Sequence, residues 1–221
     1  MTAKNPTARY RLHCAGGSGN SFKVALFLNC ARLDWLPVGV DLAGGQNGDP
    51  AWRAATNAMG EVPVLEVDGR RMSQSGAILM WLAETHGAFG PAGAEETFET
   101  MRWLLFDNHK FTGSYALHRN LFSKVQEPHP AVLAYMRSRV ESAFSIVDRH
   151  LAERCFMLGE RPTIIDFSLA GYLYYPTTET GIDLAATFPA IDTWRRRLAA
   201  LPGWKPPYEM MPVGNSLPMR V

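Results

Sequence analysis

The residues of this sequence best suited to chemistry lie in a loop near its N-terminus, where a strand-like segment gives way to a helical one. Ser18, Asn20 and Ser21 put two hydroxyls and a side-chain amide at the expected start of that helix. Donors at a helix N-terminus stabilise an anion, so they lower the pKa of a bound thiol. The alternative is an ordinary glycine-rich turn with a helix cap.

The stabilisation that this chemistry needs is within reach of a few hydrogen bonds. Lowering a thiol pKa from about 8.5 to about 6.5 requires roughly 2.7 kcal/mol of preference for the thiolate. One hydrogen bond to a charged group contributes about 1.5 to 3 kcal/mol, and a helix end contributes about 0.3 to 1 kcal/mol. We therefore predict that Ser18 and Asn20 can hold a thiolate without a general base.

Val62-Pro63 is a second feature, because a proline without an N–H opens a run that otherwise has the pattern of a strand inside a sheet. A cis peptide bond would account for the proline. It would also turn the main chain of Val62 outward, leaving its N–H and C=O free to pair with an extended peptide. A trans proline at a strand edge is the alternative.

Gln74 and Ser75 form a third feature, at the expected start of a later helix. The first N–H groups of a helix are unsatisfied and carry partial positive charge, so a carboxylate is stabilised beside them. A hydroxyl and an amide add to this effect. The pair therefore predicts an anion site, although a serine in this position is often a plain helix cap.

The segments around these residues alternate between strand and helix. The patterns predict strands over residues 10–14, 36–42, 62–67 and 70–72 and helices over residues 20–33, 51–55 and 75–85. Asp68-Gly69 is a hairpin signal, so the last two strands should be antiparallel. The resulting order, β-α-β-α-β-β-α, is that of a thioredoxin-like α/β domain over residues 8–86.

From His86 to Ala94 the composition shifts to glycine, alanine and proline, which is typical of a connector between domains. We expect an all-α helical bundle domain over residues 95–215. Its helices are predicted over residues 95–122, 130–153, 164–175 and 188–201.

Composition and charge exclude several classes of protein. The chain has 221 residues, of which 47% are hydrophobic and 19% charged, as in ordinary folded proteins. Its 22 basic and 21 acidic residues give a net charge of +1, so we expect no nucleic-acid partner. Three scattered cysteines, with no leader or membrane-spanning run, indicate the reducing cytoplasm; we expect no metal site.

Taken together, these motifs resemble the glutathione transferases over essentially the whole chain. Ser18 to Val24 is similar to the activating loop of serine-type and bacterial members, including the Nu-type enzymes. Asn57 to Leu65 resembles their cis-proline segment, with Ala58 where proline is usual, and Gln74 to Ile78 resembles their γ-glutamyl-binding motif. Thr163 to Asp166 resembles the capping box of a buried helix in their second domain.

The resemblance implies a homodimeric enzyme that uses glutathione as its co-substrate. Val62 and Pro63 would hold its main chain, Gln74 and Ser75 its γ-glutamyl end, and Ser18 and Asn20 its thiolate, with Gln46 as a further contact. The thiolate would attack a hydrophobic, electrophilic small molecule. Glutathione-dependent disulfide exchange, as in Nu-type enzymes, and a non-catalytic binding protein remain alternatives.

The second substrate is expected between the Ser18 loop and the first long helices of the second domain. Phe111, Tyr115 and Arg119 are candidates to line that pocket, although aromatic residues at helical spacing usually belong to a core. Two nearer candidates for sulfur chemistry are set aside. Tyr10 precedes the loop by eight residues and is expected in the core, and Cys14 is expected to be a buried apolar thiol.

Overall fold

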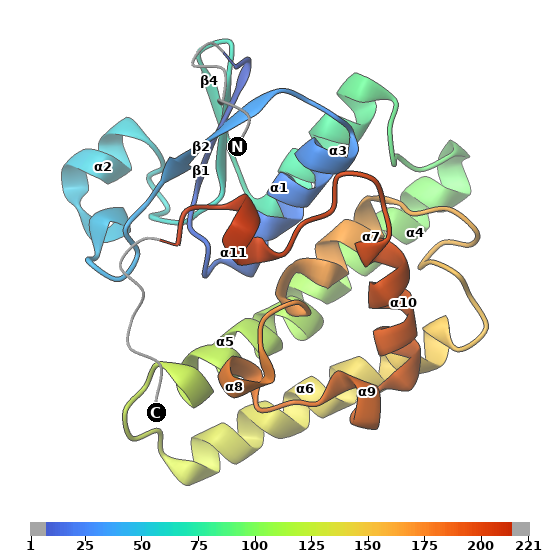
Figure 1. Cartoon of the computed structure of the whole chain (residues 1–221). Coiled ribbons are helices and arrows are strands. Elements are labelled where there is room, and N and C mark those ends of the chain that lie inside the picture. Colours follow the sequence, from blue (N-terminus) through green and yellow to red (C-terminus); the bar gives the residue numbers. More distant parts are fainter. Residues whose placement is uncertain (1–7, 214–221) are drawn as a thin grey trace. The chain divides into compact units, whose positions relative to one another are not determined.

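The computed structural model describes residues 8–213, which divide into two compact units, each treated by itself (Figure 1). Of the described residues, the first unit holds 8–88 and 201–213. The second unit begins at Phe89 and continues to Ala200. Within the described residues no helix is both long and apolar enough to cross a membrane.

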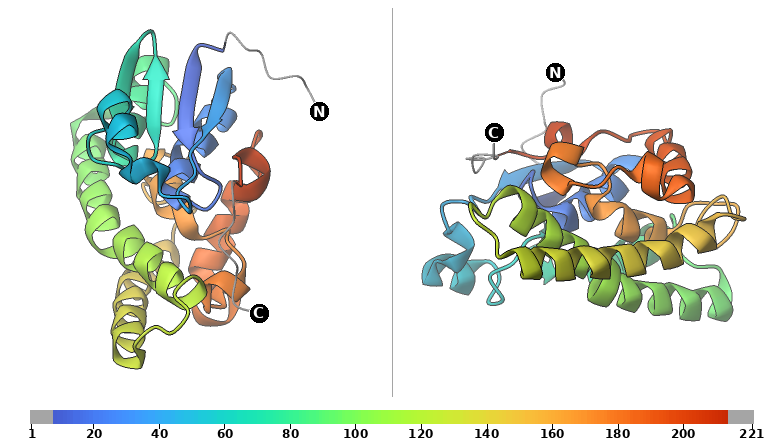
Figure 2. Two further views of the ribbon diagram at one scale, coloured as in Figure 1. Left: turned by 90° about the vertical axis from the view of Figure 1, so that its left-hand side faces the viewer. Right: turned by 90° about the horizontal axis from the view of Figure 1, so that it is seen from below.

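The first unit is a four-stranded sheet with helices on both sides (Figures 1 and 2). Its sheet has the order β2-β1-β3-β4, in which β1 pairs parallel to β2 and antiparallel to β3, and β3 pairs antiparallel to β4. Its elements are β1 (Tyr10–Cys14), α1 (Gly19–Cys30), β2 (Trp35–Gly39), η1 (Gln46–Gly48), α2 (Pro50–Ala55), β3 (Val64–Val67), β4 (Arg70–Ser73), α3 (Ser75–His86) and α11 (Pro207–Met210).

The predicted order of strands and helices in this unit is confirmed, including the hairpin at Asp68-Gly69. Two strands are shorter than predicted, for local reasons. Strand β2 ends before Asp41, whose N–H and C=O are both occupied by Gln46, at 2.8 and 2.9 Å. Strand β3 starts only at Val64, because Pro63 has no N–H to donate to a ladder.

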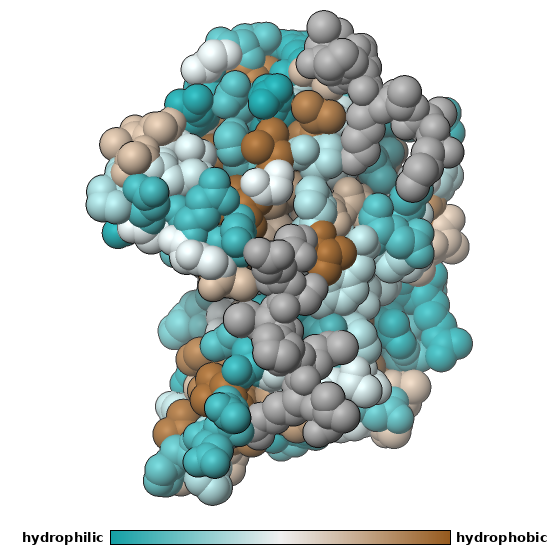
Figure 3. Space-filling model, turned by 60° about the vertical axis from the view of Figure 1, so that its left-hand side comes forward, coloured by the Kyte–Doolittle hydropathy of each residue, from teal (hydrophilic) through white to brown (hydrophobic). Residues whose placement is uncertain are grey.

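The core of this unit lies between the sheet and the packed pair α1 and α3. Alternate residues of β1, Leu65 of β3 and the inner faces of both helices are at most 2% exposed; they include Tyr10, Leu12, Cys14, Phe22, Leu26, Leu65, Ile78, Leu79 and Leu82. Tyr10 and Cys14 are therefore core residues, as predicted. On the face shown in Figure 3, hydrophobic residues lie in separate patches among hydrophilic ones.

The second unit is helical. Its elements are α4 (Gly93–Phe106), the π-helical turn η2 (Asp107–Phe111), α5 (Thr112–Ser123), α6 (Pro130–Leu151), α7 (Ile164–Leu169), η3 (Ala170–Tyr172), α8 (Thr177–Thr180), α9 (Leu184–Thr187) and α10 (Pro189–Ala199). The short helices α8, α9 and α11 were not predicted, since each has only four residues and no full period of its own.

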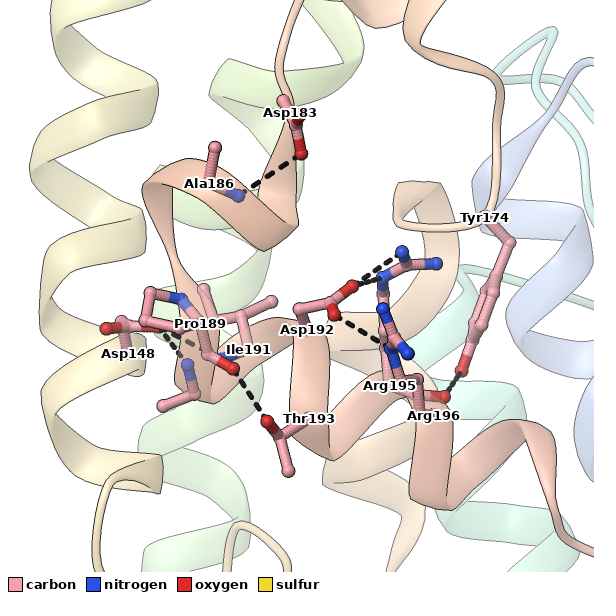
Figure 4. A network of polar contacts seen from close by, with 11 residues as sticks. Asp148, Tyr174, Asp183, Ala186, Pro189, Ile191, Asp192, Thr193, Arg195 and Arg196 are labelled. Atoms are coloured by element: carbon pink, nitrogen blue, oxygen red, sulfur yellow. Dashed lines mark hydrogen bonds and ion pairs between the residues drawn. The ribbon is translucent and has the colours of Figure 1, made fainter.

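Polar side chains fix the ends of the helices in this unit. Asp148 of α6 accepts the N–H groups of Ala190 and Ile191 at 2.9 and 3.0 Å, which caps the start of α10 (Figure 4). Asp166 is fully buried in α7 and accepts from the N–H of Thr163 at 2.8 Å, as the capping box predicts. Burial raises the pKa of Asp166, while its several donors act in the opposite direction.

Residues 201–213 differ from the expectation that the helical domain extends to residue 215. They belong to the first unit, where Asn29 of α1 donates to the carbonyl of Gly203 at 3.1 Å. Helix α11 also contacts α1. Residues 201–213 thus belong to the same unit as residues 8–88. The part of the predicted domain beyond residue 213 lies outside the described residues.

The segment predicted as one helix over 95–122 is instead interrupted by the π-helical turn η2. The wider turn brings the carbonyl of Asn108 close to Gly113, where an added Cβ would lie 2.6 Å from that oxygen. A residue with a side chain cannot occupy this position without moving backbone. The glycine is therefore a requirement of the turn.

We expect Gly113→Ala to lower the free energy of unfolding by about 1 to 3 kcal/mol, because the new methyl group would overlap the Asn108 carbonyl. Urea denaturation followed by circular dichroism measures the effect. Gly48→Ala is the matched control, since nothing lies within 4 Å of its added Cβ. Equal stability of the two variants would contradict this account of the turn.

Candidate functional site

The register of the sheet brings the predicted site segments to one end of the first unit. In that register His13 lies opposite Val64, Val64 lies opposite Ser73, and Cys14 lies opposite Gly39. The last residues of β1, β2 and β4 and the first residue of β3 therefore lie together at one end of the strands, which we call the shared edge of the sheet. The loops carrying Ser18, Gln46, Val62 and Gln74 all leave from that edge.

The loop after β1 turns into α1 at Ser18, which is 7% exposed and caps the helix. Its Oγ accepts a hydrogen bond from the N–H of Ser21 at 3.2 Å. The hydroxyl proton takes no part in that bond and can be donated to another acceptor. Among the described residues that O–H has no acceptor, and neither do the N–H groups of Gly19 and Asn20. Ser18 thus remains able to donate to a ligand.

Asn20 lies in the first turn of α1 beside this hydroxyl. Its Oδ1 is buried and has no hydrogen-bond partner among the described residues, and the same is true of the Ser21 hydroxyl. Buried polar atoms are almost always paired in folded proteins. The start of α1 therefore carries polar atoms that the described residues do not pair.

The Val62-Pro63 bond is cis, as predicted. Val62 is half-buried, and its N–H and C=O have no hydrogen-bond partner within the part of the chain that the structure describes. Since β3 begins two residues later, the main chain of Val62 lies just before the first residue of that strand. It can therefore accept an extended peptide segment as an added strand.

Helix α3 begins at Ser75, which is 6% exposed. The helix has no acidic residue in its first turn and no side-chain cap, so the N–H groups of Ser75 and Gly76 stay free of acceptors among residues 8–213. The preceding Gln74 has φ of 69°, a conformation that costs a non-glycine residue about 1 to 3 kcal/mol. The start of α3 therefore offers unpaired N–H donors of the kind that suit an anion.

Glu61 was missed by the sequence analysis, although its carboxylate accepts the Gln74 side-chain amide at 2.9 Å. The segment before Pro63 is itself held in place from η1 and α2. Asn47 donates to the carbonyl of Gly60 at 2.7 Å, and Arg53 donates to that of Ala58 at 3.1 Å. These bonds join residues that only the folded loop brings together, so the sequence offered no signal for them.

Gln46 is exposed, and its Oε1 accepts a hydrogen bond from the N–H of Asp41 at 2.8 Å. This bond fixes the side chain within its own loop and leaves the amide nitrogen as a donor. The residue predicted as a ligand contact therefore also shapes the loop that presents it.

Pro212 is a second neighbour that the sequence analysis missed. Its carbonyl accepts the N–H of Gly16 at 2.6 Å, within the loop that leads to Ser18. A Cβ on Gly16 would lie 2.9 Å from that oxygen, so the close approach requires glycine. The segment near the end of the chain thereby supports the loop that carries Ser18.

The structure places Phe111, Tyr115 and Arg119 in the interior of the second unit, each at most 3% exposed. Phe111 stacks on Phe144 with ring centres 4.3 Å apart, and burial raises the pKa of Tyr115 to about 12. Arg119 donates through Nε to Glu179 at 3.0 Å. These are contacts of core residues, so the structure differs from the expectation that the three line a pocket.

The described residues contain no group of three or more histidine, cysteine, aspartate or glutamate side chains that could hold a metal ion. Cys14, Cys30 and Cys155 form no disulfide bond, and burial raises the pKa of Cys30 to about 11. A thiol of that pKa is protonated at neutral pH and is a poor nucleophile.

Comparison with known proteins identifies the family. Residues 12–92 match the profile of the glutathione S-transferase N-terminal domain, and residues 78–204 match that of the glutathione S-transferase C-terminal domain. The chain belongs to the glutathione S-transferase family. Its fold is accordingly the thioredoxin-like domain followed by a helical domain that is typical of these enzymes.

Individual relatives of this glutathione S-transferase are moderately similar over nearly their whole length. The disulfide-bond oxidoreductase YfcG of Escherichia coli (strain K12) is 26% identical over 191 residues, which is 83% of this chain and 87% of YfcG. A glutathione S-transferase from Xanthobacter autotrophicus Py2 has a crystal structure with a TM-score of 0.80 and 32% identity, covering 90% of this chain and 98% of its own.

A third relative was solved with ligand. The glutathione transferase homologue from Lodderomyces elongisporus, with two GSH per subunit, has a TM-score of 0.80 and 26% identity. The match covers 92% of this chain and 99% of that protein.

Proposed function

We propose that this protein is a glutathione transferase that binds glutathione at the shared edge of its sheet and conjugates its thiolate to an electrophilic small molecule. The observation that carries the proposal is the sheet register, which gathers an unpaired main chain at Val62, an open helix end at Ser75 and a free hydroxyl at Ser18. A tripeptide with a thiol and carboxylates matches these three features.

Glutathione is held at its cysteinyl main chain, at its γ-glutamyl end and at the rim of the site. Its cysteinyl main chain pairs with the N–H and C=O of Val62, in the manner of an added strand. Its γ-glutamyl carboxylate lies at the start of α3, where the Ser75 hydroxyl and the first N–H groups donate to it. Gln46 and Gln74 each contribute a side-chain amide at the rim.

The thiolate is stabilised by the start of α1. The Ser18 hydroxyl donates to the sulfur, Asn20 supplies a second polar contact, and the helix end adds a favourable field. The thiol proton leaves to solvent. The thiolate then attacks an electrophilic carbon, forming an S–C bond while the electron pair of the displaced bond leaves with its group or moves to a neighbouring atom that takes up a proton.

The cell compartment follows from the same chemistry. Three free cysteines suit a reducing environment, and reduced glutathione is abundant in the cytoplasm. We therefore propose a cytoplasmic enzyme whose second substrate is a small hydrophobic electrophile.

The enzyme is also proposed to be a homodimer. Phe98, Met101 and Leu105 follow one another at helical spacing on α4 and are 64%, 46% and 64% exposed. Glu99 and Arg102 flank this stripe as an ion pair, with Arg102 Nε donating at 2.9 Å. An apolar stripe with a polar rim is typical of an interface, and a second copy of the chain supplies an equal stripe.

Ser18→Ala is expected to lower kcat/KM for conjugation by roughly 10- to 100-fold while glutathione affinity changes little, because it removes a hydrogen bond to the thiolate. Ser75→Ala should do the reverse, weakening glutathione binding about 10-fold with little loss of kcat at saturation. Steady-state kinetics with 1-chloro-2,4-dinitrobenzene and calorimetry with glutathione separate the two effects.

The Ser18→Thr variant serves as a control, since it keeps both the helix cap and the hydroxyl and should retain activity. Ser145→Ala tests for unspecific effects, because that hydroxyl donates only to the Glu141 carbonyl on α6. Unchanged turnover in a Ser18→Ala, Asn20→Ala double variant would refute the roles assigned here. Turnover of glutathione mixed disulfides alone would refute conjugation as the reaction.

Leu105→Glu combined with Phe98→Glu is expected to convert the dimer into monomers, because charges would replace the exposed apolar stripe of α4. Sedimentation velocity measures the change. Leu117→Glu is the control, as Leu117 is 47% exposed on α5. A wild-type protein that is monomeric at micromolar concentration, or a dimer unaffected by the α4 charges, would contradict the proposal.

A further inference from the structure

The second unit contains a pocket of about 200 Å³ between the region of η2 and α5 on one side and α6 on the other. It is lined by Lys110, Ser114, Ser138, Arg139, Ser142 and Ala143. All six residues belong to one unit, and none of them has a role in the proposed function. Since liquid water occupies ~30 Å³ per molecule, the pocket has room for a phosphate-sized group and some of its waters.

Ser114 is the buried hydroxyl residue among those that line this pocket. It is only 3% exposed, and its hydroxyl has no hydrogen-bond partner among residues 8–213. The hydroxyl of a helical serine can bond back to a carbonyl one turn earlier, as those of the buried Ser123 and the exposed Ser145 do at 2.8 and 2.7 Å. The Ser114 hydroxyl instead remains available to whatever fills the pocket.

Two cationic side chains, Lys110 and Arg139, line the pocket. Lys110 is exposed and has no carboxylate partner within the described part of the chain. Arg139 donates to the hydroxyl of Tyr135 at 3.4 Å, with its guanidinium 5.8 Å from the ring centre, and has no carboxylate partner among residues 8–213. That contact steadies the guanidinium and leaves most of its N–H groups free.

The carboxylates near the pocket are already engaged. Glu141 on α6 is held by Arg137 at 2.7 Å, and Asp107 in η2 accepts the Ser168 hydroxyl at 2.6 Å. No acidic side chain lines the pocket itself. Its polar side chains are therefore an ammonium, a guanidinium and hydroxyls, a set dominated by donors that suits an anion with several acceptor oxygens.

The π-helical turn explains how these groups meet. By inserting a wider turn before α5, η2 sets the positions of Lys110 and Ser114 relative to α6, which it contacts directly. Turns of this kind occur frequently at functional sites. Gly113, at the start of α5, leaves room for the Asn108 carbonyl of this turn.

We propose that this pocket binds a small oxyanion, a phosphate or sulfate group, either free or as the end group of a metabolite. Lys110 and Arg139 neutralise the charge, and the hydroxyls of Ser114 and Ser142 donate to its oxygens. The site is separate from the carboxylate site proposed at Ser75. It does not depend on the protein being a glutathione transferase.

The test is calorimetric titration of the full chain with inorganic phosphate, at an ionic strength held constant with sodium chloride. The wild-type protein should show saturable binding, in the presence of saturating glutathione and in the Ser75→Ala variant as well. Lys110→Gln and Arg139→Gln should each weaken it about 10-fold or more, and Ser114→Ala should weaken it too. Arg149→Gln, which removes an equal charge from the same helix outside the pocket, should leave it unchanged.

A parallel titration with phenyl phosphate distinguishes the two sources of the anion. Tighter binding of the ester than of inorganic phosphate would identify a metabolite end group, and equal or weaker binding would identify the free ion. The absence of saturable binding to the wild-type protein by either probe would overturn the proposal, whether or not the variants fold. Equal affinity in the wild type, Lys110→Gln and Arg139→Gln would also overturn it.

Discussion

The antiparallel pairing of β1 with β3 is the constraint on which the placement of the candidate site depends. It sets the end of β1 against the start of β3, and the β3–β4 hairpin then returns the chain to the same edge. The parallel β2 adds its following loop. A slip of one residue in this register would turn Leu12 and Leu65 out of the core, so burial of the apolar face also fixes the site.

The shared edge carries a set of polar groups that have no hydrogen-bond partner among the described residues. The Val62 main chain, the first N–H groups of α3 and the buried polar atoms of Asn20 and Ser21 lack partners among the described residues. Leaving such groups unpaired in the interior costs about 1 to 3 kcal/mol each. A ligand that pairs with them recovers this cost, which favours a molecule with an extended peptide backbone and charged ends.

Much of the first unit could be predicted from sequence because its signals are local. The alternation of apolar and polar residues in β1, the Asp68-Gly69 turn and Pro63 each indicate a backbone conformation from only a few neighbouring residues. The contacts that sequence analysis missed join distant residues, such as Gly16 with Pro212 and Glu61 with Gln74. Phe111 and Tyr115 show the limit of periodicity, since helical spacing alone does not distinguish a pocket wall from a core.

The central claim is that the start of α1 ionises the thiol of bound glutathione. Ultraviolet absorbance of the thiolate, recorded across pH for the glutathione complexes of the wild type and Ser18→Ala, tests it most directly. The account predicts a thiol pKa lowered by about two units in the wild type and largely restored in the variant, in line with roughly 2.7 kcal/mol of thiolate stabilisation. Glutathione that binds with an unshifted thiol pKa would contradict the claim.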